Sequence, residues 1–294
     1  MNGLNSINTY RFLPFLFAAA VLAVCVLSVP SVTGAQEIEL VNQPVTISGL
    51  TGLIATTTPH TMPKGVVEAA VSSLNETSAS SEYTINEFPV SITLGVSDSV
   101  EVALKGSYLY KEGSPGTGRV RGSGDSEISA KWNMMLQKEG SILPATALFL
   151  TALGLTGDKE DGLNRVSTWG ARAGLSFGWE LSWEDHQIGV YGDAQVVVKD
   201  LNRNEYRDRY GVYNAGILLP ISKYHNLQLL IEYSGVGGKK FADIDGTDSN
   251  TITYGVRMVS ERFNLTVGDQ MIYKTVSSQK NSGRLIGTLS VKFR

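Results

Sequence analysis

The chain of 294 residues contains a single cysteine, Cys25, which lies in an apolar stretch close to the N-terminus. The pattern of residues 1–35 predicts a secretory signal that is removed, and the mature chain then has no thiol. A disulfide, a thiolate metal site and a cysteine nucleophile are therefore excluded from the mature protein.

Residues 1–35 have the parts that a secretory signal needs. Arg11 precedes the apolar run of residues 12–29, and the small residues that end at Ala35 predict cleavage directly after that position. Two alternatives stay open at this point. The apolar run is long enough for a retained anchor helix, and the residues around Cys25 faintly resemble a lipidation site.

Long apolar runs and basic charge are also scarce. After residue 35 no segment is apolar enough to form a membrane-spanning helix. The formal net charge of −3 provides no basic surface for nucleic acid. The sequence therefore predicts neither a helical membrane protein nor a nucleic-acid partner.

Residues that could carry catalysis or hold a metal are few. The histidines are His60, His186 and His225, and the pair Asp185-His186 comes nearest to a catalytic arrangement, but no serine motif accompanies it. The acidic run Asp243–Asp248 suits a hard cation, yet it lacks the EF-hand register. The sequence thus predicts no enzyme, no cofactor and no metal site.

The chain does have regular alternation of apolar and polar residues. From Gln187 to Lys199 the even positions are apolar or small and most odd positions are polar, and the run that ends at Phe293 repeats the pattern. Because successive side chains of a strand point to opposite faces, each run predicts a strand with one apolar and one wet face. The helical period of 3.6 residues fits neither run.

About twelve such runs follow residue 63, each near or above the roughly 9 to 11 residues that a tilted strand needs to cross a bilayer. They are residues 64–73, 87–97, 99–111, 124–136, 141–155, 166–181, 186–199, 209–221, 227–235, 250–260, 262–275 and 283–294. The predicted fold is all-β, a transmembrane antiparallel up-and-down β-barrel over residues 64–294. Residues 36–63, rich in proline and glycine, are predicted to form a leader that lies across the periplasmic mouth or enters the lumen.

The connections between the runs alternate in length. Those after even-numbered runs are hairpin-sized, whereas the longer ones are 74–86, 112–123, 156–165, 200–208, 236–249 and 276–282. Outer-membrane barrels have short periplasmic turns and long outer loops, so both termini are predicted in the periplasm of a Gram-negative bacterium. A secreted β-sandwich would also alternate, but its strands are shorter and its loops show no such parity.

Aromatic residues of the predicted outer face gather near the ends of the runs. Such girdles mark the interfaces of a barrel with outer-membrane lipid and lipopolysaccharide. They are Tyr108, Tyr110, Trp169, Phe177, Trp179, Tyr233, Phe263 and Phe293. The last run, Leu289–Phe293, followed by Arg294, resembles the C-terminal signal that the barrel-assembly machinery reads.

Charged residues of both signs occupy the predicted inner face. Burying them is costly unless they pair or stay hydrated, so a charged channel and a plugged lumen locked by ion pairs both stay open. The predicted lumen-lining residues are Glu68, Glu101, Lys105, Asp125, Glu127, Lys131, Arg172, Glu180, Asp193, Glu232, Arg257 and Lys292. Gly170, Gly174 and Gly178 share this face, where they favour sharp curvature over the alternative of leaving room inside.

Part of the chain resembles a known family. The stretch Gly124–Trp132 (GDSEISAKW), then Leu143–Leu148 (LPATAL) and Leu155–Asp158 (LTGD), are similar to the outer-membrane barrels of the meta-pathway of phenol degradation, a group regarded as transporters. In that family a proline stands where this chain has Leu155. The resemblance implies passage of small, hydrophobic or aromatic solutes across the outer membrane.

The sequence therefore predicts an outer-membrane channel or facilitator for passive uptake of a small-molecule solute. The alternative is a non-conducting barrel with a structural, surface-interaction or adhesion role.

Overall fold

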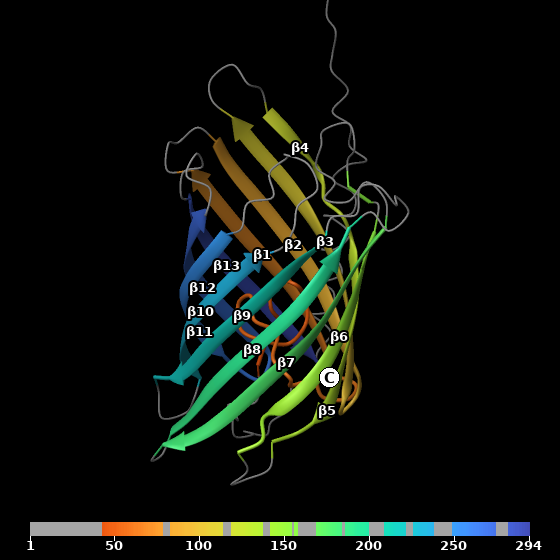
Figure 1. Cartoon of the computed structure of the whole chain (residues 1–294), viewed down its shortest axis with the longest axis vertical. Helices are drawn as coiled ribbons and strands as arrows, with labels where there is room; N and C mark the ends of the chain where they lie inside the picture. The colour runs from red at the N-terminus through yellow and green to blue at the C-terminus, as the bar shows by residue number, and fades with distance from the viewer. Residues whose placement is uncertain are drawn as a thin grey trace, which may run out of the picture.

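The computed structural model describes residues 43–78, 83–113, 119–137, 142–154, 156–157, 169–183, 186–199, 209–221, 226–237, 249–274 and 282–294. Their strands form one closed, antiparallel β-barrel (Figure 1). No helix among them is long and apolar enough to cross a membrane.

The wall is built from strands that pair with their neighbours in chain order. β4 and β5 both pair with β3, one beyond the other, so together they fill one of twelve positions in the ring. β1 pairs with both β2 and β13, which closes the ring and confirms the predicted fold. The strands are β1 (Val67–Ser78), β2 (Tyr83–Ser97), β3 (Val100–Gly113), β4 (Arg119–Ser123), β5 (Glu127–Met135), β6 (Ala145–Leu153), β7 (Gly170–Trp183), β8 (His186–Val198), β9 (Arg209–Pro220), β10 (Leu227–Gly237), β11 (Ser249–Val259), β12 (Phe263–Lys274) and β13 (Ser282–Phe293).

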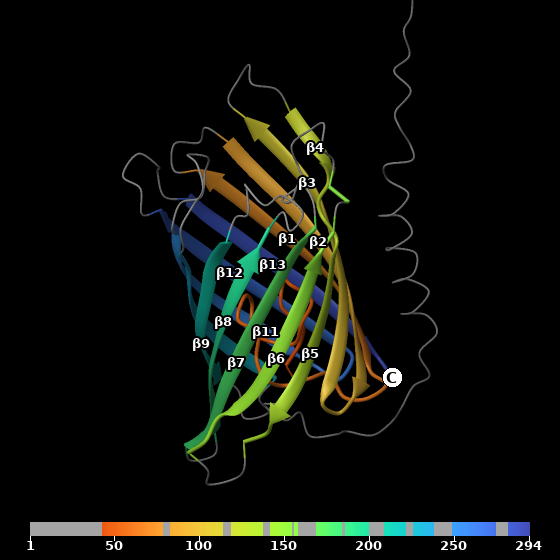
Figure 2. The same cartoon turned by 45° about the vertical axis from the view of Figure 1, so that its right-hand side comes forward.

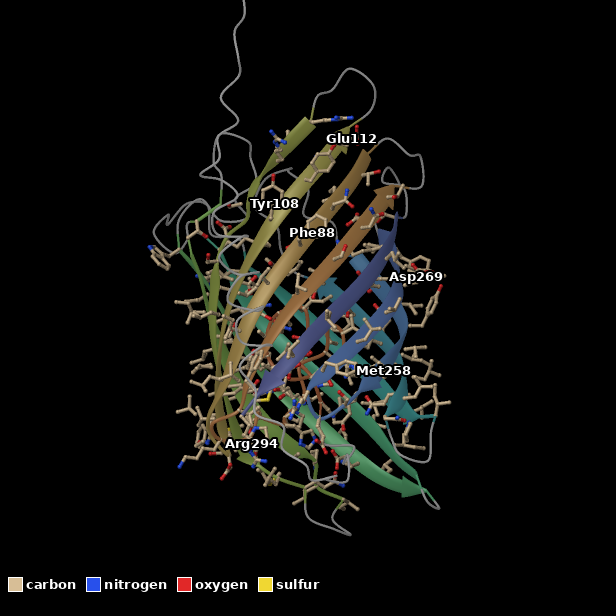
Figure 3. The ribbon with its side chains drawn as sticks, turned by 180° about the vertical axis from the view of Figure 1, so that it is seen from behind. Phe88, Tyr108, Glu112, Met258, Asp269 and Arg294 are labelled. Carbon is tan, nitrogen blue, oxygen red and sulfur yellow. The ribbon has the colours of Figure 1, made fainter. Side chains whose placement is uncertain are left out.

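The outer wall carries an apolar belt. Figure 3 shows Met258 and Asp269 on this wall, between Glu112 at one end and Arg294 at the other. In hydrocarbon every backbone polar group needs a partner, which a closed ladder provides. The apolar belt on a closed barrel confirms the predicted outer-membrane location and contact with lipid. Exposed members of the belt include Ile92, Leu104, Trp132, Leu150, Val196, Ile217, Ile231, Val256, Val267 and Leu289.

Two of the predicted outer loops are partly strand, which corrects the boundaries drawn from the sequence. β1 and β2 extend through most of the loop predicted at residues 74–86, and β4 occupies the end of the loop predicted at 112–123. Beyond the lipid, outward side chains meet water, so both strand faces can be polar and the alternation disappears. The outward Asn75 and Asn86, which hydrogen-bond to each other across β1 and β2, illustrate this.

The glycines of β7 make room for inward-facing rings. A Cβ atom added to Gly174 would collide with the ring of Phe149, and one added to Gly178 would lie 2.7 Å from the ring of Tyr191 and 2.9 Å from Pro59. The favoured interpretation, that these glycines permit sharp curvature, is therefore not needed at these two positions. The structure supports the alternative, in which small residues leave space inside the barrel.

We predict that Gly174→Val destabilises the folded barrel by about 1–3 kcal/mol, because the new side chain overpacks the lumen against Phe149. The midpoint of thermal unfolding, followed by the heat-modifiable mobility of the barrel on SDS gels, measures the loss. Gly106→Val is the matched control, since a Cβ atom there meets no atom within 4 Å. Equal losses in the two variants would contradict the packing role of Gly174.

Candidate functional site

Residues 43–63, which we call the leader, lie inside the barrel, nearer the end that holds the C-terminus (Figures 1 and 2). Isolated bridges join Val45 to Thr51 and Gly52 to Thr57, so the leader folds back on itself. Gly49 has a φ of 91° at the first turn, a conformation that favours glycine. The earlier part of the predicted leader, 36–42, and the predicted signal lie outside the described residues.

The carboxylate of Glu232 on β10 binds the centre of the leader. It accepts hydrogen bonds from the backbone N–H groups of Ile54 (2.6 Å), Ala55 (2.9 Å) and Thr56 (2.8 Å), and from the Thr56 hydroxyl (2.7 Å). Hydrogen bonds to an ionised acceptor are about twice as strong as neutral ones. Because Glu232 is 1% exposed, bulk water cannot readily replace these partners.

A buried ion pair between Glu101 on β3 and Lys131 on β5 holds the leader on both sides of its centre. Lys131 Nζ lies 2.9 Å from Glu101 Oε1. Glu101 accepts the N–H groups of Thr51 (2.8 Å) and Met62 (2.7 Å), and Lys131 donates to the carbonyls of Thr51 (2.9 Å) and Thr58 (3.0 Å). The leader thus supplies the further hydrogen bonds that a desolvated ion pair requires.

Three more wall side chains bond to the leader backbone. Asp193 on β8 accepts the N–H of Thr57 at 2.8 Å. Arg257 on β11 donates to the carbonyl of Gly52 at 3.1 Å, and Asn133 on β5 donates to a carbonyl near the end of the leader, that of Pro59, at 2.8 Å. Peptide groups that have left bulk water therefore find partners on several strands around the ring.

An apolar pair anchors the leader between these polar contacts. Leu53 and Ile54 are buried in a cluster with Leu74, Tyr191, Leu218, Leu230 and Ile286. Inward-facing glycines leave the necessary space. Complete burial of such a side chain contributes roughly 1.5–3 kcal/mol. The leader is therefore packed into the lumen by apolar contacts as well as by hydrogen bonds.

A second group of charges lies beyond the leader, towards the opposite end of the barrel. Lys105 Nζ is 3.1 Å from one carboxylate oxygen of Glu127, and Arg172 bonds to the other oxygen. Arg284 pairs with Glu76 at 2.5 Å on other strands. The side chains of Arg172 and Arg284 are 20% and 29% exposed, so solvent reaches this part of the lumen.

The side chains predicted to line the lumen fall into distinct groups. Ten are buried, and Arg172 and Glu180 are partly buried. Those that contact the leader are Glu68, Glu101, Lys131, Glu180, Asp193, Glu232 and Arg257. Lys105, Glu127 and Arg172 form the second group. Asp125 accepts a hydrogen bond from the N–H of Gly157, and Lys292 Nζ lies 3.9 Å from Glu68 Oε2.

Sequence reasoning missed most of the leader's own contribution. The threonines at 51 and 56–58, Asn133 and the pair of Glu76 with Arg284 were not singled out. The segment does carry a weak signal, because the apolar pair Leu53-Ile54 lies between turn-forming glycine and a run of three threonines. Such a composition suits a segment that packs inside a polar lumen.

The other candidates from the sequence are only partly described. Asp185, His225 and the acidic run 243–248 lie outside the described residues, as does the side chain of His186. In the part of the chain that is described, no group of three or more His, Cys, Asp or Glu side chains is placed to hold a metal. His60 belongs to the leader, where its Nε2 lies 2.8 Å from Glu180 Oε1.

Comparison with known proteins supports the fold. No family model matches the sequence, and no curated protein matches it. The chain is similar to the solved structure of the COG4313 outer-membrane channel from Pseudomonas putida F1, with a TM-score of 0.58 and 16% identity over 80% of this chain and 97% of that one. The NanC and KdgM porins give TM-scores of 0.48 and 0.47 with 7% and 8% identity, each over 76% of this chain and 99% of theirs.

At these identities the similarity shows the fold alone, that of an outer-membrane β-barrel. The resemblance of the sequence to the barrels of the phenol-degradation pathway stays a prediction.

We predict that Glu232→Ala loosens the centre of the leader, because three backbone N–H groups lose their acceptor. Hydrogen exchange of residues 53–57 should accelerate by at least about tenfold, since a hydrogen bond to a charged group contributes about 1.5–3 kcal/mol. Mass-spectrometric exchange in detergent measures the change. Glu127→Ala, which alters a carboxylate beyond the leader, should leave this exchange unaffected; unchanged exchange in Glu232→Ala would disprove the anchoring role.

Proposed function

We propose that the protein is an outer-membrane channel for the passive uptake of small solutes, and that the leader closes the periplasmic half of its lumen. The supporting observation is the division of the inner face into two parts. Beyond the leader, partly exposed arginines contact solvent. At the level of the leader, buried charges bind its backbone.

The manner in which the leader is attached supports a closing element that can move. Its isolated bridges connect the leader to itself, and its contacts with the wall strands come mainly from wall side chains. A displaced leader would therefore leave the ladders of the wall intact. Gly65, with a φ of 76° and open space around its Cβ position, stands between the leader and β1.

The proposal also includes the chemical class of the solute. Passage of hydrophobic or aromatic solutes is implied by the sequence resemblance. The part of the lumen beyond the leader, by contrast, carries charged side chains among the described residues. Both features are satisfied by small solutes with an apolar body and a polar group. Lipopolysaccharide around the wall and recognition of β13 by the assembly machinery also remain proposals that follow from the barrel fold.

A second candidate function is a non-conducting barrel with a structural or surface role. The observation that favours it is the density of contacts around the leader, where Glu232 alone accepts four hydrogen bonds. A leader bound this firmly could seal the barrel permanently. Measured flux decides between the two functions.

We predict that the purified full chain in liposomes admits small solutes slowly and that Glu232→Ala raises the rate about tenfold or more, because the leader loses its central acceptor. Liposome swelling and planar-bilayer conductance measure the rates. Arg284→Gln serves as the control, because it changes a charged lumen side chain that bonds to Gln270 and Glu76 and does not touch the leader. Absence of flux in both the wild type and Glu232→Ala would support the sealed barrel instead.

A cysteine pair provides a reversible test of the same element. The Cβ position of Gly49 in the leader is 3.5 Å from the Cβ atom of Ala103 on β3, at the short end of the range that disulfides span. In Glu232→Ala, adding Gly49→Cys and Ala103→Cys should stop the increased flux under oxidation and restore it on reduction. Replacing Gly49 strains the turn because its φ is 91°, so the reduced form of the same variant is the reference for that strain. Equal flux with the disulfide formed and with it reduced would exclude movement of the leader as the cause of the increase.

A further inference from the structure

Arg172 presents a guanidinium group that is only partly used by the protein. Its Nη2 donates a hydrogen bond to Glu127 Oε2, and the side chain is 20% exposed. Within the described ranges, Nε and Nη1 have no protein acceptor. An arginine has five N–H donors in a planar fork that matches a carboxylate, so this one retains donors that can face a solute.

Arg172 shares its carboxylate partner with a second cation. Lys105, from β3, bonds to the remaining oxygen of Glu127 at 3.1 Å, so two cations share one carboxylate. The strand registers place Glu127 directly opposite Lys105, and place Thr151 and Val197 on either side of Arg172. The cluster therefore places two cations on one carboxylate, beside a hydroxyl group and an apolar side chain.

The cluster stands immediately beyond the leader. Leu50 of the leader packs against Ala103 and Phe149. Ala103 precedes Lys105 by two residues on the inner face of β3, and Phe149 precedes Thr151 by two residues on β6. A solute that enters from the side opposite the leader thus meets the partly exposed Arg172 before it meets Leu50.

We infer that Arg172, with the positive charge of the neighbouring Lys105, binds the carboxylate group of a small solute at the surface of the leader. This inference rests on the proposed channel function and names its solute class. The guanidinium donates two parallel N–H bonds to the carboxylate, and the ammonium group adds a second charge. Glu127 competes for both cations, which keeps binding weak enough for release, as conduction requires.

Arg284 provides a matched comparison in the same part of the lumen. Its Nη1 donates to Gln270 at 3.3 Å and its Nη2 to Glu76 at 2.5 Å. One carboxylate neutralises this one cation, and both terminal nitrogens have protein acceptors. Arg284 is therefore a charged, partly exposed arginine that is not expected to bind the solute.

The experiment titrates the full chain in detergent with propionate and with its neutral counterpart propionamide, followed by ligand-observed NMR. The wild type should bind propionate more tightly than propionamide. Arg172→Gln should weaken propionate binding about 10- to 100-fold, as expected for hydrogen bonds to a charged group. Arg172→Lys keeps the charge without the planar fork, so its affinity for propionate should lie between those of the wild type and Arg172→Gln. Glu127→Gln removes the competitor and should tighten binding, whereas Arg284→Gln should stay within about twofold of the wild type.

Heat-modifiable gel mobility verifies that each variant is folded before titration. Unchanged propionate binding in folded Arg172→Gln, or equal binding of propionamide and propionate to the wild type, would overturn the inference. Binding is measured without flux, so the two proposals can fail separately. Propionate binding through Arg172 without any flux would refute the proposed channel function. Flux without preferential binding of propionate would refute only the solute site at Arg172.

Discussion

A peptide group removed from water must find another partner, and this constraint determines both the wall and its contents. In the wall it is met by pairing strands on both sides, except for the short β4, which is paired with β3; β1 and β13 complete the ring. Inside the ring the leader faces the same requirement without a ladder of its own to the wall. Charged side chains of the wall satisfy it, and an unpaired group there would cost several kcal/mol.

The mixed charge of the lumen has two different roles in this structure. Near the leader, Glu101, Lys131 and Glu232 act as hydrogen-bonding partners of a folded segment, so their cost of desolvation is offset by contacts that the barrel alone does not supply. Beyond the leader, Arg172, which is paired with the buried Glu127, remains in contact with solvent. A list of inward-facing charges therefore combines residues that stabilise the leader with residues that a solute can reach.

The wall was largely predictable from the sequence because its two faces meet different solvents. The alternation from Gln187 to Lys199 indicates β8 directly, since lipid selects one face and the lumen the other. The same logic fails for β4, which lies where the sequence predicts a loop, because alternation no longer marks a strand where both faces can be polar. Hydropathy thus marks the lipid-embedded span of a strand better than its hydrogen-bonded length.

The position of the leader could not be predicted in the same way. Its central acceptor, Glu232, is 176 to 178 residues away from the N–H groups that it binds, and no local pattern encodes such a pairing. Alternation did place Lys105, Glu127 and Arg172 on the inner face. Their sharing of a single carboxylate depends on strand register, which periodicity alone does not specify.

The leader is followed within a few residues by β1, the strand that meets the final strand at the seam of the barrel. Chain order therefore links filling of the lumen to closure of the barrel, because the leader is joined directly to β1, one of the two strands that pair last in the ring. Joining strands so distant in sequence carries the largest entropic cost of any ladder in the wall. From β1 the leader extends into the lumen and bonds to β8, β10 and β11. These contacts connect β1 to the far side of the barrel and oppose separation of β1 from β13.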